Sequence, residues 1–348
     1  MKATKSFLCV HGHFYQPPRE DPFTGDYRVE ESATPYKNWN ERITAECYRP
    51  IADMGGFEHI SFNLGGTLAR WMAEKAPSVY HKIVDSAQSH YSRWGSSNAI
   101  AQSVHHTILP LAQGRDKRCQ IQWGIASFLY RFGYRPRGLW LPEMAVDLET
   151  LDIVSESGLS FVILSESQVD GELNAGAGPY RVSLPGDRSI TVFVRDDALS
   201  NYLSFQMPSP DRADAWINRA LKDRDAAQLT LIATDGETFG HHQSQGVEVL
   251  KRLLSPRARD GYEVTTLGHY LQTHPPETEI RVIENSAWSC NHRLGRWLTG
   301  CACTPGCGHW KGALRRALDN LSHEIDQVYS DIVSQQDVAP WRLRDDYI

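Results

Sequence analysis

The chain has 348 residues, of which 41% are hydrophobic and 22% are charged, and its formal net charge is −6. This length suits one large α/β barrel or two ordinary domains, and the composition is ordinary for a soluble globular enzyme. A basic footprint for nucleic acid is missing, and no apolar run approaches the roughly 18 residues that span a bilayer, so we expect neither a nucleic-acid nor a membrane partner.

The N-terminal region carries one short apolar stretch, residues 7–10. It is too short for the hydrophobic region of a signal peptide, and no small-residue cleavage site follows it, so we expect a cytoplasmic protein. Seven cysteines do not make a disulfide scaffold, and in that compartment we expect reduced thiols.

Short apolar, β-prone runs alternate with helical patterns along most of the chain. We expect strands at residues 7–10, 57–62, 137–141, 161–164, 191–194 and 229–233. Helical patterns cover residues 115–132 and 148–157, and a further one runs from about 311 to 330. The alternation predicts parallel βαβ units, and the continuously apolar strands indicate a sheet covered on both faces.

Polar side chains follow several of these strands directly. His11 and His13 come after the first expected strand, Glu143 after the third and Asp235 after the sixth. The C-terminal ends of the strands form the active-site face of a parallel barrel, and an open doubly wound sheet gives the same pattern. Asp147, in contrast, is expected to be only a helix N-cap or a solvated charge.

Two of these positions carry carboxylates of the kind that glycoside hydrolysis needs. The segment Gly138-Leu-Trp-Leu-Pro-Glu143 places a glutamate just past a buried strand, where Pro142 ends the ladder. A second strand leads into Asp235-Gly-Glu237, and Gly236 permits a tight turn there. Two carboxylates from different strand ends can face one sugar, the first as nucleophile and the second as proton donor.

Three of the motifs resemble those of glycoside hydrolase family 57. They read His11-Gly-His13-Phe-Tyr-Gln16-Pro, Trp140-Leu-Pro-Glu143, and the strand that ends at Asp235, and the resemblance covers roughly residues 6–300. Phe14 and Tyr15 separate His13 from Gln16, where the family's motif runs without a break. The resemblance implies an α/β fold, a distorted and incomplete (β/α)7 barrel with a short C-terminal loop-plus-helix extension.

The same resemblance implies the chemistry and the roles of the site residues. The partner would be an α-glucan or oligosaccharide, acted on by a retaining hydrolase or transferase of amylase, glucanotransferase or branching type that needs no cofactor for catalysis. Glu143 would be the nucleophile and Asp235 the acid/base. The substrate-binding residues would be His11, His13, Gln16, Trp140, Glu237, His241, His242 and Trp288.

The character of the chain changes after residue 283, where Trp, Cys, Gly and His concentrate. We therefore expect a catalytic barrel over residues 1–283, and a Cys/Trp-rich loop and helix packing on it over residues 284–348. Four cysteines in this loop predict a structural zinc site or, alternatively, reduced thiols or a labile disulfide. They are Cys290, Cys301, Cys303 and Cys307, with His292 and His309 beside them.

Two other functions fit parts of the pattern. A metal-dependent carbohydrate deacetylase would use His11, His13, His241 and His242 as ligands of a divalent ion that activates water, but it would leave Glu143 without a role. A non-catalytic glucan-binding protein would keep the barrel and lose the turnover. Both catalytic carboxylates are present, which favours the enzyme.

Overall fold

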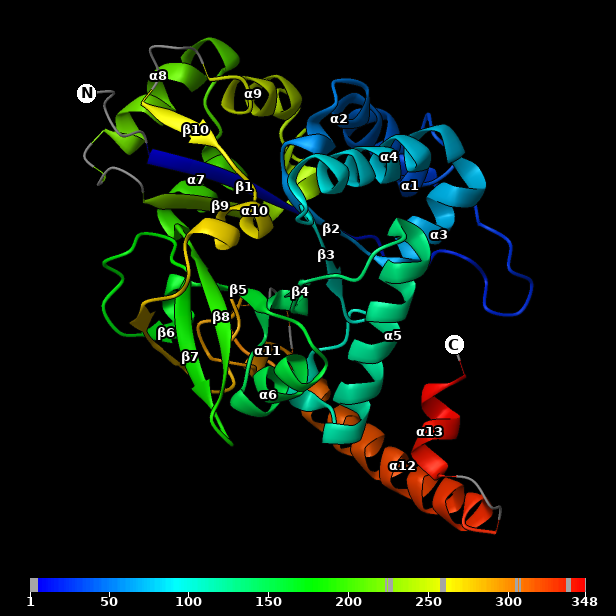
Figure 1. The fold of residues 1–348 in the computed structure, drawn as a ribbon. Helices are drawn as coiled ribbons and strands as arrows, with labels where there is room; N and C mark the ends of the chain where they lie inside the picture. The colour runs from blue at the N-terminus through cyan, green and yellow to red at the C-terminus, as the bar shows by residue number, and fades with distance from the viewer. Residues whose placement is uncertain are drawn as a thin grey trace.

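A curled, mostly parallel sheet forms the centre of the computed structural model, which describes residues 6–222, 224, 228–256, 261–303, 306, 308–335 and 339–347 (Figure 1). Strand β1 pairs with β9 on one side and with β2 on the other, and the order continues through β3, β4 and β5 to β8. The bounds of these strands are β1 Ser6–Phe14, β2 Ser61–Leu64, β3 Ala99–Gln102, β4 Gly138–Trp140, β5 Phe161–Ser165, β8 Arg188–Arg195 and β9 Leu229–Asp235.

The barrel is left incomplete between β8 and β9. Strand β7 (Tyr180–Leu184) pairs antiparallel with the first part of β8, on the edge that β5 does not use. In the described part of the chain β8 and β9 share no ladder, and the backbone N–H of Asp196 donates to the carbonyl of Leu231 at 2.8 Å. The predicted distorted, incomplete barrel is therefore confirmed, with β7 on the edge of β8 that β5 leaves open.

Helices surround the sheet, as Figure 1 shows, and bury both of its faces. All residues of β2, β3 and β5 are buried, as expected for a sheet covered on both faces, although β2 and β3 include the polar residues Ser61, Asn63 and Gln102. The helices are α1 Trp39–Ile43, α2 Arg49–Asp53, α3 Gly66–Lys75, α4 Pro77–Trp94, α5 Gly114–Phe132, α6 Leu148–Glu156, α7 Asp197–Gln206, α8 Pro210–Leu221, α9 Gly246–Leu253, α10 Leu267–Thr273, α11 Gly295–Leu298, α12 Trp310–Val333 and α13 Pro340–Asp345. The remaining strands are β6 Val169–Asp170, β10 Tyr262–Val264, β11 Thr278–Glu279 and β12 Arg281–Val282.

The largest errors in the expected strand boundaries concern the first two strands. The second strand begins at Ser61 and not at residue 57, because Gly55 adopts a left-handed φ of 72° and leads Phe57 into a helical turn. The first strand runs on to Phe14, so His11 and His13 lie within β1 and not after it. Asp147 caps α6 as predicted, since its side chain accepts the backbone N–H of Thr150.

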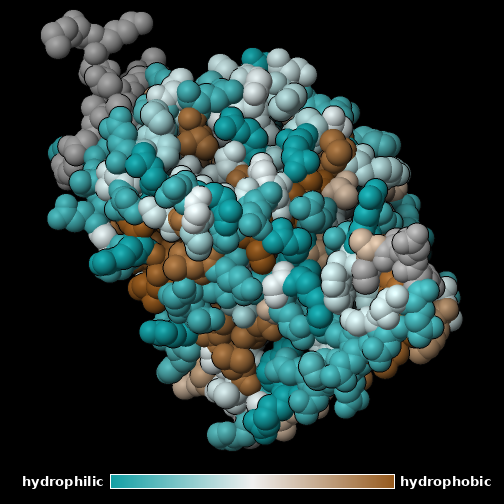
Figure 2. All heavy atoms as spheres, turned by 60° about the horizontal axis from the view of Figure 1, so that its bottom comes forward, coloured by the Kyte–Doolittle hydropathy of each residue, from teal (hydrophilic) through white to brown (hydrophobic). Residues whose placement is uncertain are grey.

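The C-terminal helices contact the barrel through α5. Arg344 pairs with Asp116 at 2.6 Å, and the indole N–H of Trp123 donates to the carbonyl of Asp345 at 3.0 Å. Figure 2 brings this lower part of the molecule forward and shows hydrophobic patches among the mainly hydrophilic surface. Helix α12 exposes an apolar stripe made of Leu314, Leu318, Leu321, Ile325, Val328 and Ile332. Across the described residues, none of the helices combines the length and the apolarity that a membrane span requires.

Candidate functional site

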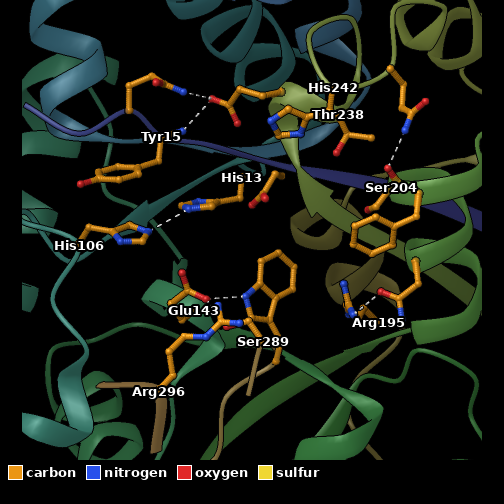
Figure 3. Close-up of a pocket in the computed structure, with 17 residues that line it drawn as sticks. His13, Tyr15, His106, Glu143, Arg195, Ser204, Thr238, His242, Ser289 and Arg296 are labelled. Atoms are coloured by element: carbon orange, nitrogen blue, oxygen red, sulfur yellow. Dashed lines mark hydrogen bonds between the residues drawn. The ribbon is translucent and has the colours of Figure 1, made fainter. Parts of the chain in front are cut away.

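A pocket of about 850 Å³ opens where the C-terminal ends of β1, β4, β8 and β9 meet the loop that follows residue 283. Its size lies within the range of roughly 300–1,000 Å³ that is usual for small-molecule sites. Glu143, Ser289 and Arg296 lie in one part of it, and Tyr15 and His242 lie across from them (Figure 3). The predicted residues that line it are Glu143, Asp235, His13, Gln16, Glu237, His242 and Trp288.

Glu143 sits in a left-handed turn directly after β4. Its φ is 58° and that of Met144 is 48°, conformations that cost non-glycine residues of order 1–3 kcal/mol each and cluster at functional sites. The loop after residue 283 fixes this turn, because the backbone N–H of Trp288 donates to the Glu143 carbonyl at 3.2 Å. The turn aims the carboxylate into the pocket (Figure 3).

One oxygen of the Glu143 carboxylate receives both of its side-chain hydrogen bonds. The indole N–H of Trp288 donates to Oε2 at 3.1 Å, and the hydroxyl of Ser289 donates to the same atom. Within the described residues, no hydrogen bond reaches Oε1. The carboxylate is therefore oriented through one oxygen while the other faces the pocket.

Asp235 ends β9 and is the one residue of that strand with an exposed side chain, which opens into the pocket. Although the side chain is accessible from the pocket, many protein atoms lie close around its carboxyl group. This desolvation and the negative charge of Glu143 raise the pKa of Asp235 to about 6, against the opposing charge of Arg195. The two carboxyl groups thus share one pocket, and the charge of Glu143 raises the pKa of Asp235. Asp235 can therefore carry a proton in mildly acidic solution.

Glu237 is a third acid in the wall of the pocket and is almost completely buried. Its Oε1 accepts the hydroxyl of Tyr48 at 2.6 Å, the backbone N–H of Tyr15 at 3.2 Å and the amide of Gln16 at 3.4 Å. Burial raises the pKa of Glu237 to about 8, with a further contribution from Asp235 that the Tyr48 hydrogen bond opposes. A pKa of about 8 favours the protonated form of Glu237 at pH 7, and the three donors on Oε1 leave Oε2 free to carry the proton.

A histidine network forms the floor beside β1. Asn63 Oδ1 lies 3.2 Å from a ring nitrogen of His11 and of His13, and the Nε2 atoms of His13 and His106 are 3.0 Å apart. Burial lowers the pKa of His11 to about 3, and burial together with His106 lowers the pKa of His13 well below its usual value. Both rings of β1 are consequently neutral and can each donate and accept one hydrogen bond.

Three predicted substrate-binding residues do not line the pocket. His11 and Trp140 are fully buried, and their rings stack on each other at a centroid distance of 5.0 Å. Trp140 also stacks on His13 at 4.7 Å, so it supports the floor and offers no face to a sugar. His241 lies outside the lining because its Nδ1 contacts the carboxylate of Glu46 at 2.5 Å.

Several pocket residues were missed. His106 follows β3 in a loop with a φ of 55°, and its ring stacks on Tyr15 at 3.9 Å. The short strand β3 was not predicted, so nothing marked the residues that follow it. Arg195 ends β8 and places its guanidinium 4.8 Å from the ring centre of Trp288. Its position after a predicted strand was the available signal. Ser289 and Arg296 come from the loop beyond residue 283.

One cluster in the described part of the chain has the composition and spacing of a metal site. It consists of Cys290, His292, Cys301 and Cys303, whose ligand atoms all lie within 4.8 Å of one another. Cys307 lies outside the described residues. None of the four lines the pocket, and the histidines and acids of the pocket do not converge in this way. The metal-centred arrangement that a deacetylase needs is thus missing from the described pocket residues.

The chain is similar to known proteins in sequence and in fold. The family description "Glycosyl hydrolase family 57" matches residues 6–283. Alpha-amylase 1 of Dictyoglomus thermophilum is 23% identical over 208 residues, which make up 58% of this chain and 29% of that protein. A 4-alpha-glucanotransferase of Thermococcus litoralis is 23% identical over 208 residues, 58% of this chain and 30% of that protein. The chain therefore spans less than a third of the length of either relative.

A solved structure extends the likeness to the fold. The exo-type maltose-forming amylase from Pyrococcus sp. ST04 superposes with a TM-score of 0.75, over 96% of this chain and 64% of that chain, at 17% sequence identity. At this identity the superposition establishes the fold alone.

Proposed function

This chain belongs to glycosyl hydrolase family 57, and from that premise we propose that it is a retaining α-glucan-active hydrolase or transglycosylase with Glu143 as nucleophile and Asp235 as acid/base. The observation that carries the proposal is the meeting of these two carboxyl groups in one pocket. One is oriented by Trp288 and Ser289, and the other has the raised pKa that a proton donor needs.

The reaction proceeds in two displacements. Oε1 of Glu143 attacks the anomeric carbon, while protonated Asp235 gives its proton to the departing glycosidic oxygen. The resulting glycosyl ester on Glu143 is then opened by water or by a sugar hydroxyl, which Asp235 deprotonates. Two inversions at the same carbon retain its configuration.

The electrostatics of the pocket suit both halves of this cycle. The charge of Glu143 helps to keep a proton on Asp235 before the first step. Ester formation removes that charge, so the pKa of Asp235 falls and the group releases its proton more readily to the leaving oxygen. One contact between two acids thus holds the proton before the attack and favours its transfer during it.

Neutral imidazoles would recognise the hydroxyl groups of the sugar. His13 lines the pocket beside His106, and both rings have lowered pKa values because they are buried. A neutral imidazole can exchange hydrogen bonds with a hydroxyl without adding charge beside the carboxylates. Trp288 would supply an aromatic wall next to the reacting carbon.

Azide rescue tests the assignment of the two roles. Glu143→Ala should lose turnover of an activated α-glucoside, and azide should then give the inverted β-glycosyl azide. Asp235→Ala should keep partial turnover of the activated substrate, and azide should give the retained α-glycosyl azide. Glu166→Gln is the matched control, because Glu166 follows β5 at a strand end but lies outside the pocket lining. Near-normal turnover of Glu143→Ala without azide would refute the proposal.

Product analysis identifies the type of reaction. Incubation with maltooligosaccharides and amylose separates chain shortening, disproportionation and branching by the products formed. Binding of these glucans without any product would support the non-catalytic alternative, and release of acetate from an acetylated glycan would support the deacetylase.

A further inference from the structure

Three thiols and one imidazole converge in the loop after residue 283. The Sγ atoms of Cys290 and Cys301 are 3.6 Å apart, and Nδ1 of His292 lies 3.2 Å from Sγ of Cys303. A tetrahedral zinc ion with Zn–S bonds of about 2.3 Å has S···S edges of about 3.8 Å, so this cluster already has nearly the size of a zinc shell. The separation of 3.6 Å is far longer than a disulfide bond, and these cysteines are all free.

We propose that Cys290, His292, Cys301 and Cys303 bind one structural zinc ion, and that this ion fixes the loop that orients Glu143. Three thiolates and an imidazole are soft and intermediate ligands that suit zinc in a closed, four-coordinate site. The ligand set needs no fifth group from the pocket, and none of the four residues lines it. The role is therefore structural.

The loop has little regular structure among its described residues. That structure is limited to the four-residue helix α11 (Gly295–Leu298), and the buried apolar support of the loop is a small cluster of Ala145, Ala287 and Leu294. A metal that joins residues 290 and 303 closes the loop and removes much of its conformational freedom.

The ligands are joined directly to the residues that contact the nucleophile. Cys290 follows Ser289, whose hydroxyl donates to Glu143, and the next residue back is Trp288. At the other end of the cluster, Arg296 donates to the carbonyl of Cys303 at 3.1 Å and lines the pocket. Zinc binding would thus fix the positions of Trp288 and Ser289 at one end of the cluster and of Arg296 at the other. This catalytic consequence rests on the proposed function, whereas the zinc site itself does not.

Metal analysis of the purified full chain tests the site directly. We expect about one zinc ion per chain by inductively coupled plasma mass spectrometry. The variants Cys290→Ser and Cys303→Ser should each lose at least nine tenths of this zinc. Cys119→Ser is the matched control, because Cys119 is a buried cysteine on α5 outside the cluster, and it should keep its zinc. Absence of metal in the wild type, or full zinc in both cluster variants, would overturn the proposal.

Two further experiments test the fourth ligand and the geometry of the site. Cys307→Ser should retain zinc if His292 is the fourth ligand, whereas loss of zinc from Cys307→Ser and not from His292→Ala would overturn the His292 assignment. If the serine variants do not fold, the wild type can be stripped with a chelator and reloaded with Co²⁺, and the visible bands of tetrahedral thiolate-bound cobalt should appear. Their absence, with the thiols reduced, would contradict the site.

Activity then separates the two proposals. The stripped protein should lose at least tenfold in kcat with a smaller change in KM, and zinc should restore it. Zinc in a protein that never turns over a glucan would refute the proposed function and leave the site intact. Unchanged kcat after zinc removal would refute the link between the ion and Glu143.

Discussion

At the scale of single residues, burial and two neighbouring charges set the acidity of Asp235. Desolvation and Glu143 raise its pKa to about 6, and Arg195 opposes them. The sequence placed both carboxylates at strand ends and so predicted that they could meet. It could not give the pKa, because that depends on how deeply protein atoms surround the carboxyl group.

The pH dependence of the reaction should follow this balance. As acid, Asp235 must be protonated, so kcat/KM on a glucan should fall as the pH rises through about 6. Arg195→Gln removes a charge that stabilises the carboxylate, so the pKa of Asp235 should rise and the falling limb should move to higher pH. Arg181→Gln, on the exposed side of β7, should leave the limb in place. An unshifted limb in Arg195→Gln would contradict the role of this contact.

The buried acid Glu237 should make stability depend on pH. Its pKa is about 8 in the folded chain against an ordinary value of 4.5, so the folded protein alone holds this proton between those values. The free energy of unfolding should therefore fall as the pH rises across that window, by at most about 1.4 kcal/mol per pH unit for this group.

Glu237→Gln removes this slope and keeps an oxygen for the three donors. Its stability relative to wild type should grow with pH from about 4.5 to about 8 and then level off, as measured by urea unfolding. Glu248→Gln, an exposed glutamate on α9, is the control and should give a flat difference. A difference for Glu237→Gln that does not change with pH would show that the group is already ionised in the fold.

At the scale of elements, the turn after β4 depends on the loop after residue 283. The Trp288 amide and indole and the Ser289 hydroxyl all bind Glu143, which itself has a left-handed φ. A hydrogen bond to a charged group contributes roughly 1.5–3 kcal/mol. The loop therefore stabilises both the backbone conformation and the orientation of the carboxylate.

Removing these donors should lower turnover more than binding. Trp288→Phe and Ser289→Ala should each reduce kcat by roughly tenfold or more, because each leaves Oε2 with one donor fewer. Since both donors reach the same atom, the double variant should lose less than the sum of the two effects on a logarithmic scale. Strict additivity in kinetic measurements would show that the two contacts act independently.

The sequence predicted some elements and missed others for physical reasons. Strand β5 stands out because four large apolar residues follow one another in it. Strand β3 has four residues and contains a single β-branched side chain, Ile100. His11 and His13 point the same way from β1, since they are two residues apart. Only the residue nearer the C-terminal end of β1, His13, reaches the pocket. The alternation of residues along a strand does not predict how far along the barrel each side chain lies.

At the scale of the whole molecule, the site extends beyond the part that the family description covers. That match ends at residue 283, yet Trp288, Ser289 and Arg296 line the pocket. The boundary expected at residue 283 follows the change in composition. The lining of the pocket does not follow it, because the segment after 283 returns to the barrel and Ser286 bridges Val146.

Truncating the chain at residue 283 should show whether the segment beyond the family match is needed for activity. A chain that ends at residue 283 should lose turnover by at least a hundredfold, because it lacks both side-chain donors to Glu143. A chain that ends at residue 309 keeps them and the zinc ligands and should retain more of the activity. Circular dichroism should establish that both fragments are folded before kinetics are compared. Equal activity of the two would contradict a role for the loop.

The open junction of the barrel has one more consequence. Where β8 approaches β9, Arg195 reaches across and donates from Nη1 to the carbonyl of Ala233 at 3.0 Å, and the same cation opposes the proton on Asp235. If β8 and β9 move apart here, the Arg195 guanidinium moves away from Asp235 and the pKa of Asp235 rises. The spacing of β8 and β9 at this junction is thereby coupled to the proton affinity of Asp235.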